Sequence, residues 1–228
     1  MRRLVVLGCI LSTLLTSCGF IVPHRYRFRL TVEVQTPTGL RRGSSVYQVA
    51  AANMPALLPN EHKRDWSTKG DAVAVDLPDG RTLFALMRTR NPFREDLALI
   101  SLAALDPKFK NDVVESAGRV ALGFSTNRKA DVRPGDFPLL VVFENNADPK
   151  SAKEVDPTRP GSLGPGFGPI RMMIEKTGEP ITRGIEKRLP WLGAHHGALL
   201  DVPFKDYPPP GTPLPIAARI TERDFRQN

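Results

Sequence analysis

The segment from Arg25 to Gln35 alternates strictly between apolar and polar side chains. The apolar set is Tyr26, Phe28, Leu30, Val32 and Val34, and the polar set is Arg25, Arg27, Arg29, Thr31, Glu33 and Gln35. Because successive side chains of a strand point to opposite faces, this period of two predicts a β-strand with one buried and one polar face. The 22 prolines and 18 glycines of the chain would interrupt a helical bundle too often. We therefore expect a fold built on a half-buried sheet.

Further strands are predicted as partners of this one. The predicted strands are 25–35, 44–52, 71–77, 82–87, 138–143 and 170–175. Turn residues at 37–39 and 78–80 join the first four into two hairpins. Segment 138–143 is apolar throughout, which favours a central strand buried on both faces. Segments 53–70 and 145–169 are rich in prolines or polar residues, so we expect long connections there.

Two helices are predicted between the hairpins and the central strand. Asn91-Pro92 is typical of a helix start, and the residues from Leu97 to Leu105 are apolar on nearly all sides. A second helix at 112–122 has a single apolar stripe, which suits a helix that covers a sheet. Hairpins with two adjacent packed helices predict an α+β fold with a mostly antiparallel sheet, formed by one globular domain at 25–228.

The first seventeen residues have the features of an export signal. Arg2 and Arg3 precede an apolar run from Leu4 to Leu15, and Thr16 and Ser17 close it. A membrane-spanning helix needs roughly 20 apolar residues, so this shorter run is typical of a cleaved signal. The mature chain is therefore expected outside the cytoplasm.

The end of this signal, Leu15-Thr16-Ser17-Cys18-Gly19, resembles the lipobox of bacterial lipoproteins. The resemblance implies that a diacylglyceryl group is joined to the Cys18 thiol, that the signal 1–17 is removed, and that the new amino group is acylated, as with palmitate. Residues 18–24 would then be a lipidated tether. Two alternatives remain: an ordinary secretory signal, although no small-x-small cleavage site is evident before Phe20, or a Cys18 that is a buried thiol.

The lipobox also bears on disulfides and on the choice of membrane. Cys9 lies in the apolar run and leaves with the signal, so the mature chain has one thiol and forms no internal disulfide. In enteric lipoproteins an Asp after the lipidated Cys favours the inner membrane. Gly19 occupies that position here, so the resemblance favours the outer membrane, with the protein facing the periplasm.

The basic balance of the chain is partly concentrated on its first strand. The formal net charge is +8, and Arg25, Arg27 and Arg29 lie in a row on one face, roughly 6.6 Å apart. One interpretation is a membrane-surface row that meets anionic lipid headgroups. The other is a solvated strand face that pairs with acidic residues of a neighbouring strand, a common arrangement. Export argues against a nucleic-acid partner.

No motif in the chain predicts a catalytic, cofactor or metal site. His195-His196, with Asp201, lacks the paired spacing of structural zinc sites. The stretch 164–169 has prolines where a phosphate loop needs amide donors, and no Gly-x-Ser-x-Gly occurs. Trp191 is either a partner-docking residue or an aromatic side chain that closes the core.

These features favour a membrane-anchored periplasmic lipoprotein with a non-catalytic binding or envelope-accessory role. Two other hypotheses remain open: a tethered cell-envelope hydrolase with a site assembled from distant residues, or a subunit of an envelope protein complex. Segments 164–168 and 184–191 resemble uncharacterised exported proteins of proteobacteria, and that resemblance implies no activity.

Overall fold

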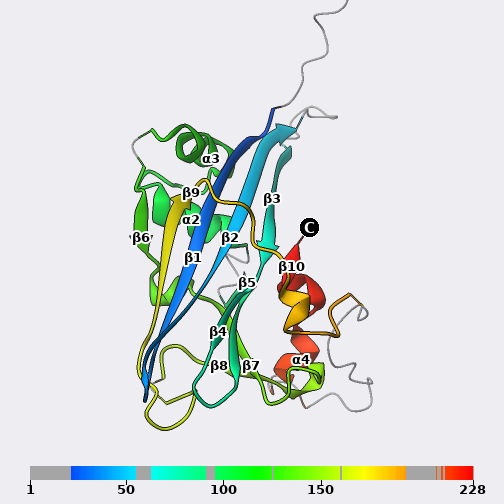
Figure 1. Ribbon diagram of the computed structural model, residues 1–228. Coiled ribbons are helices and arrows are strands. Elements are labelled where there is room, and N and C mark those ends of the chain that lie inside the picture. Colours follow the sequence, from blue (N-terminus) through cyan, green and yellow to red (C-terminus); the bar gives the residue numbers. More distant parts are fainter. Residues whose placement is uncertain are drawn as a thin grey trace, which may run out of the picture.

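The computed structural model describes residues 22–54, 63–90, 96–124, 126–159, 161–193, 209, 212 and 214–227. Their strands form two antiparallel sheets, and the predicted α+β class is confirmed (Figure 1). The first sheet has the order β10 (Arg226–Gln227), β3 (Lys63–Asp71), β2 (Gly39–Met54), β1 (His24–Thr36), β9 (Ile170–Thr177) and β6 (Lys129–Asp131). The second has the order β4 (Val73–Asp76), β5 (Thr82–Thr89), β7 (Pro138–Phe143) and β8 (Ala152–Val155).

The alternating segment forms β1, near the middle of the six-stranded sheet. Its apolar side chains are all buried, and its polar side chains lie on the opposite face, which we call the outer face. β1 pairs with β2 on one side and with β9 on the other, so that Arg29 lies opposite Val46 and Glu175. The predicted hairpin between β1 and β2 is confirmed, with β2 longer than expected.

The main core lies behind the inner face of this sheet. Helices α2 (Leu97–Leu105) and α3 (Val113–Leu122) cover one end of that face, and the four-stranded sheet covers the other end. The side chain of Asp112 caps α3 by accepting a hydrogen bond from the Glu115 N–H at 3.0 Å. Inside the core, the hydroxyl of Tyr26 bonds the hydroxyl of Ser101 on α2 at 2.7 Å.

A second core lies on the other face of the four-stranded sheet. It contains Phe84 and Phe143 from β5 and β7, together with apolar residues from the helix α4 (Ile216–Arg219) and from the 3₁₀ turns Ile185–Lys187 and Glu222–Asp224 or next to them. β7 is therefore buried on both faces, as its apolar run predicts. Trp191 packs against Phe143 and Phe225, and its indole N–H donates to the Asn146 carbonyl at 3.0 Å.

Two predicted connections need correction. Segment 53–70 is not one long connection, because β2 continues to Met54 and Lys63–Asp71 forms β3. β3 exposes Asp65, Ser67 and Lys69 while it buries Thr68, so its polar composition hides a strand. Within 145–169, Ala152–Val155 adds the edge strand β8. Helix α2 is capped by Asp96, and the predicted start at 91–92 lies outside the described residues.

Candidate functional site

Two of the three arginines in the predicted membrane-surface row have partners within the fold. Arg27 donates to the side chain of Gln48 at 3.2 Å and to the carbonyl oxygen of Glu179 at 3.0 Å. Arg29 forms an ion pair with the Glu179 carboxylate, which raises the pKa of its guanidinium. Arg25 is exposed and has no side-chain partner among the described residues. A headgroup role thus remains a prediction, and Arg25 is the member most available for it.

The partners of Arg27 and Arg29 belong to the segment that follows β9. This crossing segment, residues 178–184, passes over the outer face of the sheet from β9 towards β3 (Figure 1). Thr182 joins β2 through a pair of hydrogen bonds: its N–H donates to the Val46 carbonyl at 3.0 Å, and its hydroxyl accepts from the Val46 N–H at 2.9 Å. Arg27 and Arg29 therefore hold this segment against the sheet. This resembles the second interpretation of the row, in which the arginines pair within the fold, except that the acidic partner lies in the crossing segment and not on a neighbouring strand.

Cys18 lies outside the described residues, but the end of the fold that carries it is defined. Val22 begins the described chain and β1 starts at His24. A Cβ atom added to Gly118 of α3 would lie 3.2 Å from His24 Nε2, so α3 crosses β1 at the first residue of that strand. We call this region, with the start of β1 and the C-terminal end of α3, the tether end, after the tether that the sequence predicts at 18–24.

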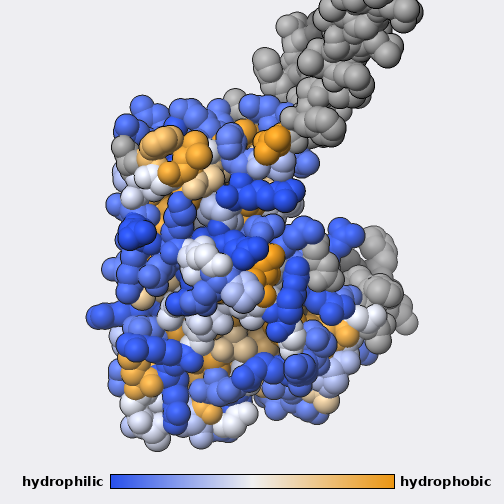
Figure 2. All heavy atoms as spheres, turned by 45° about the horizontal axis from the view of Figure 1, so that its top comes forward, coloured by the Kyte–Doolittle hydropathy of each residue, from blue (hydrophilic) through white to orange (hydrophobic). Residues whose placement is uncertain are grey.

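The tether end exposes apolar side chains. The described residues expose four large apolar side chains, and three are here: Val22 at 79%, Leu122 at 66% and Phe124 at 63%. The fourth, Leu40 at 47%, lies at the turn between β1 and β2, at the opposite end of β1. Figure 2, in which the tether end comes forward, shows apolar surface among hydrophilic side chains there.

The position of Leu122 and Phe124 is fixed by the end of α3. Gly123 between them adopts a left-handed conformation with φ of 77°, and its N–H bonds the carbonyls of Arg119 and Val120. The Lys176 ammonium donates to the carbonyls of Val120 and Ala121, the latter at 3.2 Å. The helix end is thus tied to β9, and the two apolar side chains are presented to solvent from an ordered support.

A second feature is an open edge on β9. Gln35 of β1 is hydrogen-bonded to residues 168 and 169, and hydrogen-bonded pairs alternate along an antiparallel ladder. The next hydrogen-bonded positions of β9 are therefore Arg171 and Met173. The backbone groups of Ile170 and Met172 point away from β1, towards the other edge of β9. The short strand β6 reaches only to Asp131, and the Val132 N–H bonds the Met172 carbonyl at 2.9 Å. Among the described residues, nothing bonds the Met172 N–H or the backbone groups of Ile170.

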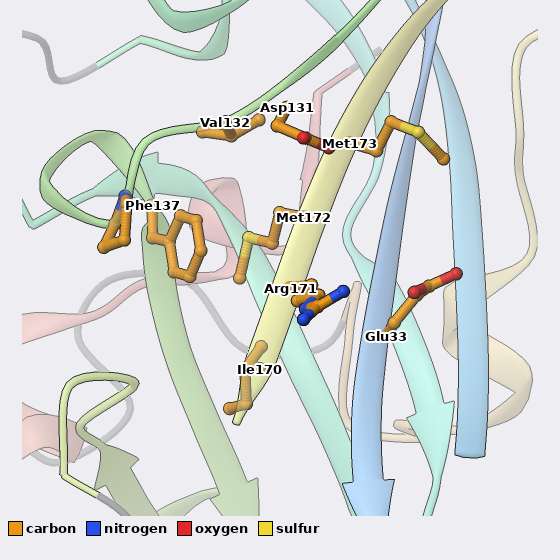
Figure 3. A pocket seen from close by; sticks show the side chains of 9 residues that line it. Glu33, Asp131, Val132, Phe137, Ile170, Arg171, Met172 and Met173 are labelled. Atoms are coloured by element: carbon orange, nitrogen blue, oxygen red, sulfur yellow. The ribbon is translucent and has the colours of Figure 1, made fainter. Parts of the chain in front are cut away.

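A groove of about 310 Å³ lies beside this open edge (Figure 3). Met172 and Phe137 point towards each other on its inner side, where Val132 and Ile170 add further apolar surface. Arg171 and Glu33 lie on its outer side. Glu33 is paired with Arg42 at 2.7 Å, whereas Arg171 has no ion-pair partner among the described residues. The groove combines free backbone groups with an apolar wall, one available cation at Arg171 and the carboxylate of Asp131.

The two most deeply buried carboxylates of the described chain have structural partners. Asp106 accepts hydrogen bonds from Ser116 and from Arg119, at 2.7 Å to its Nη2, and joins the end of α2 to α3. Burial opposes its ionisation, but these donors outweigh burial and hold its pKa below the usual value. Burial raises the pKa of Asp71, although the Ile185 N–H donates to its carboxylate at 3.1 Å. Neither carboxylate lines the groove.

The other predicted site residues divide between described and undescribed parts. His195, His196 and Asp201 lie outside the described residues, and the described part contains no group of three or more potential metal ligands. The stretch 164–169 contains the glycines Gly164 and Gly166, both with positive φ, and Phe167 lies under the Arg81 guanidinium, 5.9 Å from ring centroid to Cζ. Trp191 closes the second core, as one of its two interpretations expected.

Sequence reasoning missed both the groove and the apolar tether end. The pattern Ile170-Arg171-Met172 predicts a strand but not which of its edges is open. That edge is open because its neighbour β6, forty residues earlier in the chain, ends at Asp131. Leu122-Gly123-Phe124 did carry a usable signal, since two large apolar residues flank a glycine at a helix end, outside the apolar stripe.

No helix in the described part of the chain is long and apolar enough to cross a membrane. The chain matches no protein-family model, and comparisons with curated proteins and with solved structures find no match.

Proposed function

We propose that this protein is a lipid-anchored lipoprotein of the bacterial envelope that faces the periplasm and has a non-catalytic binding role. The observation that carries the proposal is the lipobox-like sequence Leu15–Gly19 at the end of a short apolar run. Arg25 is seven residues from Cys18, so an anchor there would keep Arg25 within about 25 Å of the lipid attachment point. Gly19 favours delivery to the outer membrane.

The anchor is tested by metabolic labelling with palmitate. The wild-type protein should carry the label, and Cys18→Ser should remove it completely, because the thioether needs this thiol. Cys9→Ser is the matched control and should keep the label, since Cys9 lies inside the signal. An unlabelled wild-type protein, or a label that survives Cys18→Ser, would contradict the proposal.

The binding role is best supported by the groove beside β9. Unpaired backbone donors and acceptors on a strand edge are complementary to an extended polypeptide, which can add a strand there. Its side chains would alternate between the apolar wall at Met172 and Phe137 and the outer side, where Arg171 favours a carboxylate. The ligand class that fits is an extended segment of a partner protein with alternating apolar and polar residues and with a carboxylate at the position opposite Arg171.

A photocrosslinking amino acid tests this groove in intact envelopes. Placed at Arg171, it should give one discrete adduct, and placed at the exposed Asp65 it should give none, because β2 and β1 separate Asp65 of β3 from β9 and its groove. Met172→Pro, which removes both the outward N–H and the apolar side chain that lines the groove, should abolish the adduct of a crosslinker at position 171. Equal crosslinking from both positions, or an adduct that Met172→Pro leaves unchanged in a folded protein, would refute a groove-specific partner.

A further inference from the structure

We propose that the tether end is a membrane-contact surface, on which Leu122 and Phe124 enter the headgroup boundary of the bilayer. This inference rests on the proposed lipid anchor and adds an orientation to it. The occupant to which we commit is a bilayer with anionic headgroups. A protein partner on the same surface is the outcome that the experiment below separates.

The first argument is the reach of the tether. Cys18 precedes Val22 by four residues, and an extended chain spans at most about 3.6 Å per residue, so the lipid attachment point lies within about 14 Å of Val22. Val22 and Leu122 are close to the contact between His24 and Gly118: Val22 is two residues before His24, and Leu122 is one helical turn after Gly118. Any acyl group on Cys18 therefore holds the tether end, and not the opposite end, near the bilayer.

The second argument is the distribution of exposed apolar surface. The side chains of Leu122 and Phe124 are mostly exposed, so they contribute little to the core. Both are nevertheless held at an ordered helix end by Gly123 and Lys176. Single exposed apolar residues are ordinary in soluble proteins. Here, however, Val22, Leu122 and Phe124 are grouped at the end of the fold nearest the proposed anchor, and grouped apolar side chains indicate a contact surface. A bilayer at that end would remove both side chains from water.

The third argument is charge. Arg25 and Arg128 are exposed near this surface, and neither side chain has an ion-pair partner among the described residues. Arg128 is placed here by its carbonyl, which accepts from the Lys176 N–H at 2.8 Å. Cations beside inserted apolar side chains are the usual composition of an interfacial surface. Arg27 and Arg29 are not needed for it, because Gln48 and Glu179 occupy them.

The orientation can be measured with the tether imposed chemically. In the chain from Cys18 to Asn228, Cys18 is the only thiol, so it can be coupled to a maleimide lipid in vesicles of phosphatidylethanolamine and phosphatidylglycerol. Phe124→Trp adds a fluorophore at the proposed contact, and Leu40→Trp adds one at the opposite end. Acyl chains brominated near the headgroup should quench the emission added at position 124 and leave that at position 40 unchanged. The unsubstituted chain supplies the background of Trp66 and Trp191.

Further variants define the expected result and its opposite. Leu122→Ser, combined with Phe124→Trp, should reduce the quenching, and Arg25→Gln with Arg128→Gln should reduce it at low salt only. Equal quenching at positions 124 and 40, or no quenching at 124, would overturn the inference and leave a protein partner for this surface. Because the tether is imposed, this result is independent of palmitate labelling, so the anchor and the orientation can fail separately.

Discussion

Gly43→Ala should lower the free energy of unfolding by more than about 3 kcal/mol, at or beyond the upper end of the usual cost of overpacking. An added Cβ atom at this position would lie 2.1 Å from the carbonyl oxygen of Ala74 and 2.9 Å from Cγ2 of Val75. The closest atoms therefore belong to the backbone of β4 and cannot move aside by a change of rotamer. At Gly43, β2 and β4 lie too close together to admit a side chain, so the two sheets would have to separate.

The measurement is denaturant unfolding followed by circular dichroism, with Gly135→Ala as the matched control. A Cβ atom added at Gly135 meets nothing within 4 Å, and neither glycine has a positive φ, so the two substitutions differ in the space available and not in backbone strain. The control should change stability by less than about 0.5 kcal/mol. A Gly43→Ala protein as stable as this control would mean that the sheets are not in contact at β4.

The close approach at Gly43 illustrates what the sequence could not predict. Its local context, Arg41-Arg42-Gly43, reads as the end of a turn, and the predicted partner strand began only at Ser44. Strand periodicity reports which residues of one strand share a face, but it does not report which second layer covers that face. The division of the strands into two sheets therefore had to come from the structure.

Elements with a strong local pattern were predicted well. In β1 and α3 the buried residues recur with the period of a strand and of a helix, so the sequence shows both the element and its buried face. In β7 every residue is buried, which the sequence shows as a continuous apolar run. β3 was missed because it exposes a polar face and lies next to the short edge strand β10, so few of its residues need to be apolar.

The candidate sites show the same limit more sharply. Alternation placed Arg27 and Arg29 on the outer face, but their partner Glu179 lies 150 residues later in the chain than Arg29. The sequence favoured an internally paired strand face over a membrane-surface row only because outward-facing arginines are common on half-buried strands, and it did not identify the partner. A contact between distant segments decides how many of these cations are available to a ligand.

Phe225→Ala should lower the free energy of unfolding by about 3 to 5 kcal/mol, the range found for buried Phe side chains. Phe225 is fully buried three residues from the C-terminus, and its ring lies 6.1, 5.9 and 5.4 Å from the ring centroids of Phe84, Phe143 and Trp191. Its carbonyl also accepts from the Ala72 N–H at 2.7 Å, which ties the end of the chain to the start of β4. The second core is thus closed by a residue that a truncated chain would lose.

Two readouts separate a cooperative loss from a local one. Global unfolding by circular dichroism reports the whole chain. Trp191 fluorescence, measured in a Trp66→Phe background, reports the second core, because the Trp191 ring contacts Phe225 edge to face. Phe124→Ala is the control, since that ring is 63% exposed and its removal should cost less than about 1 kcal/mol. Coincident transitions with a 3 to 5 kcal/mol loss would make the second core part of one folding unit, whereas an early Trp191 transition with little global loss would make the C-terminal segment a separable cover of the four-stranded sheet.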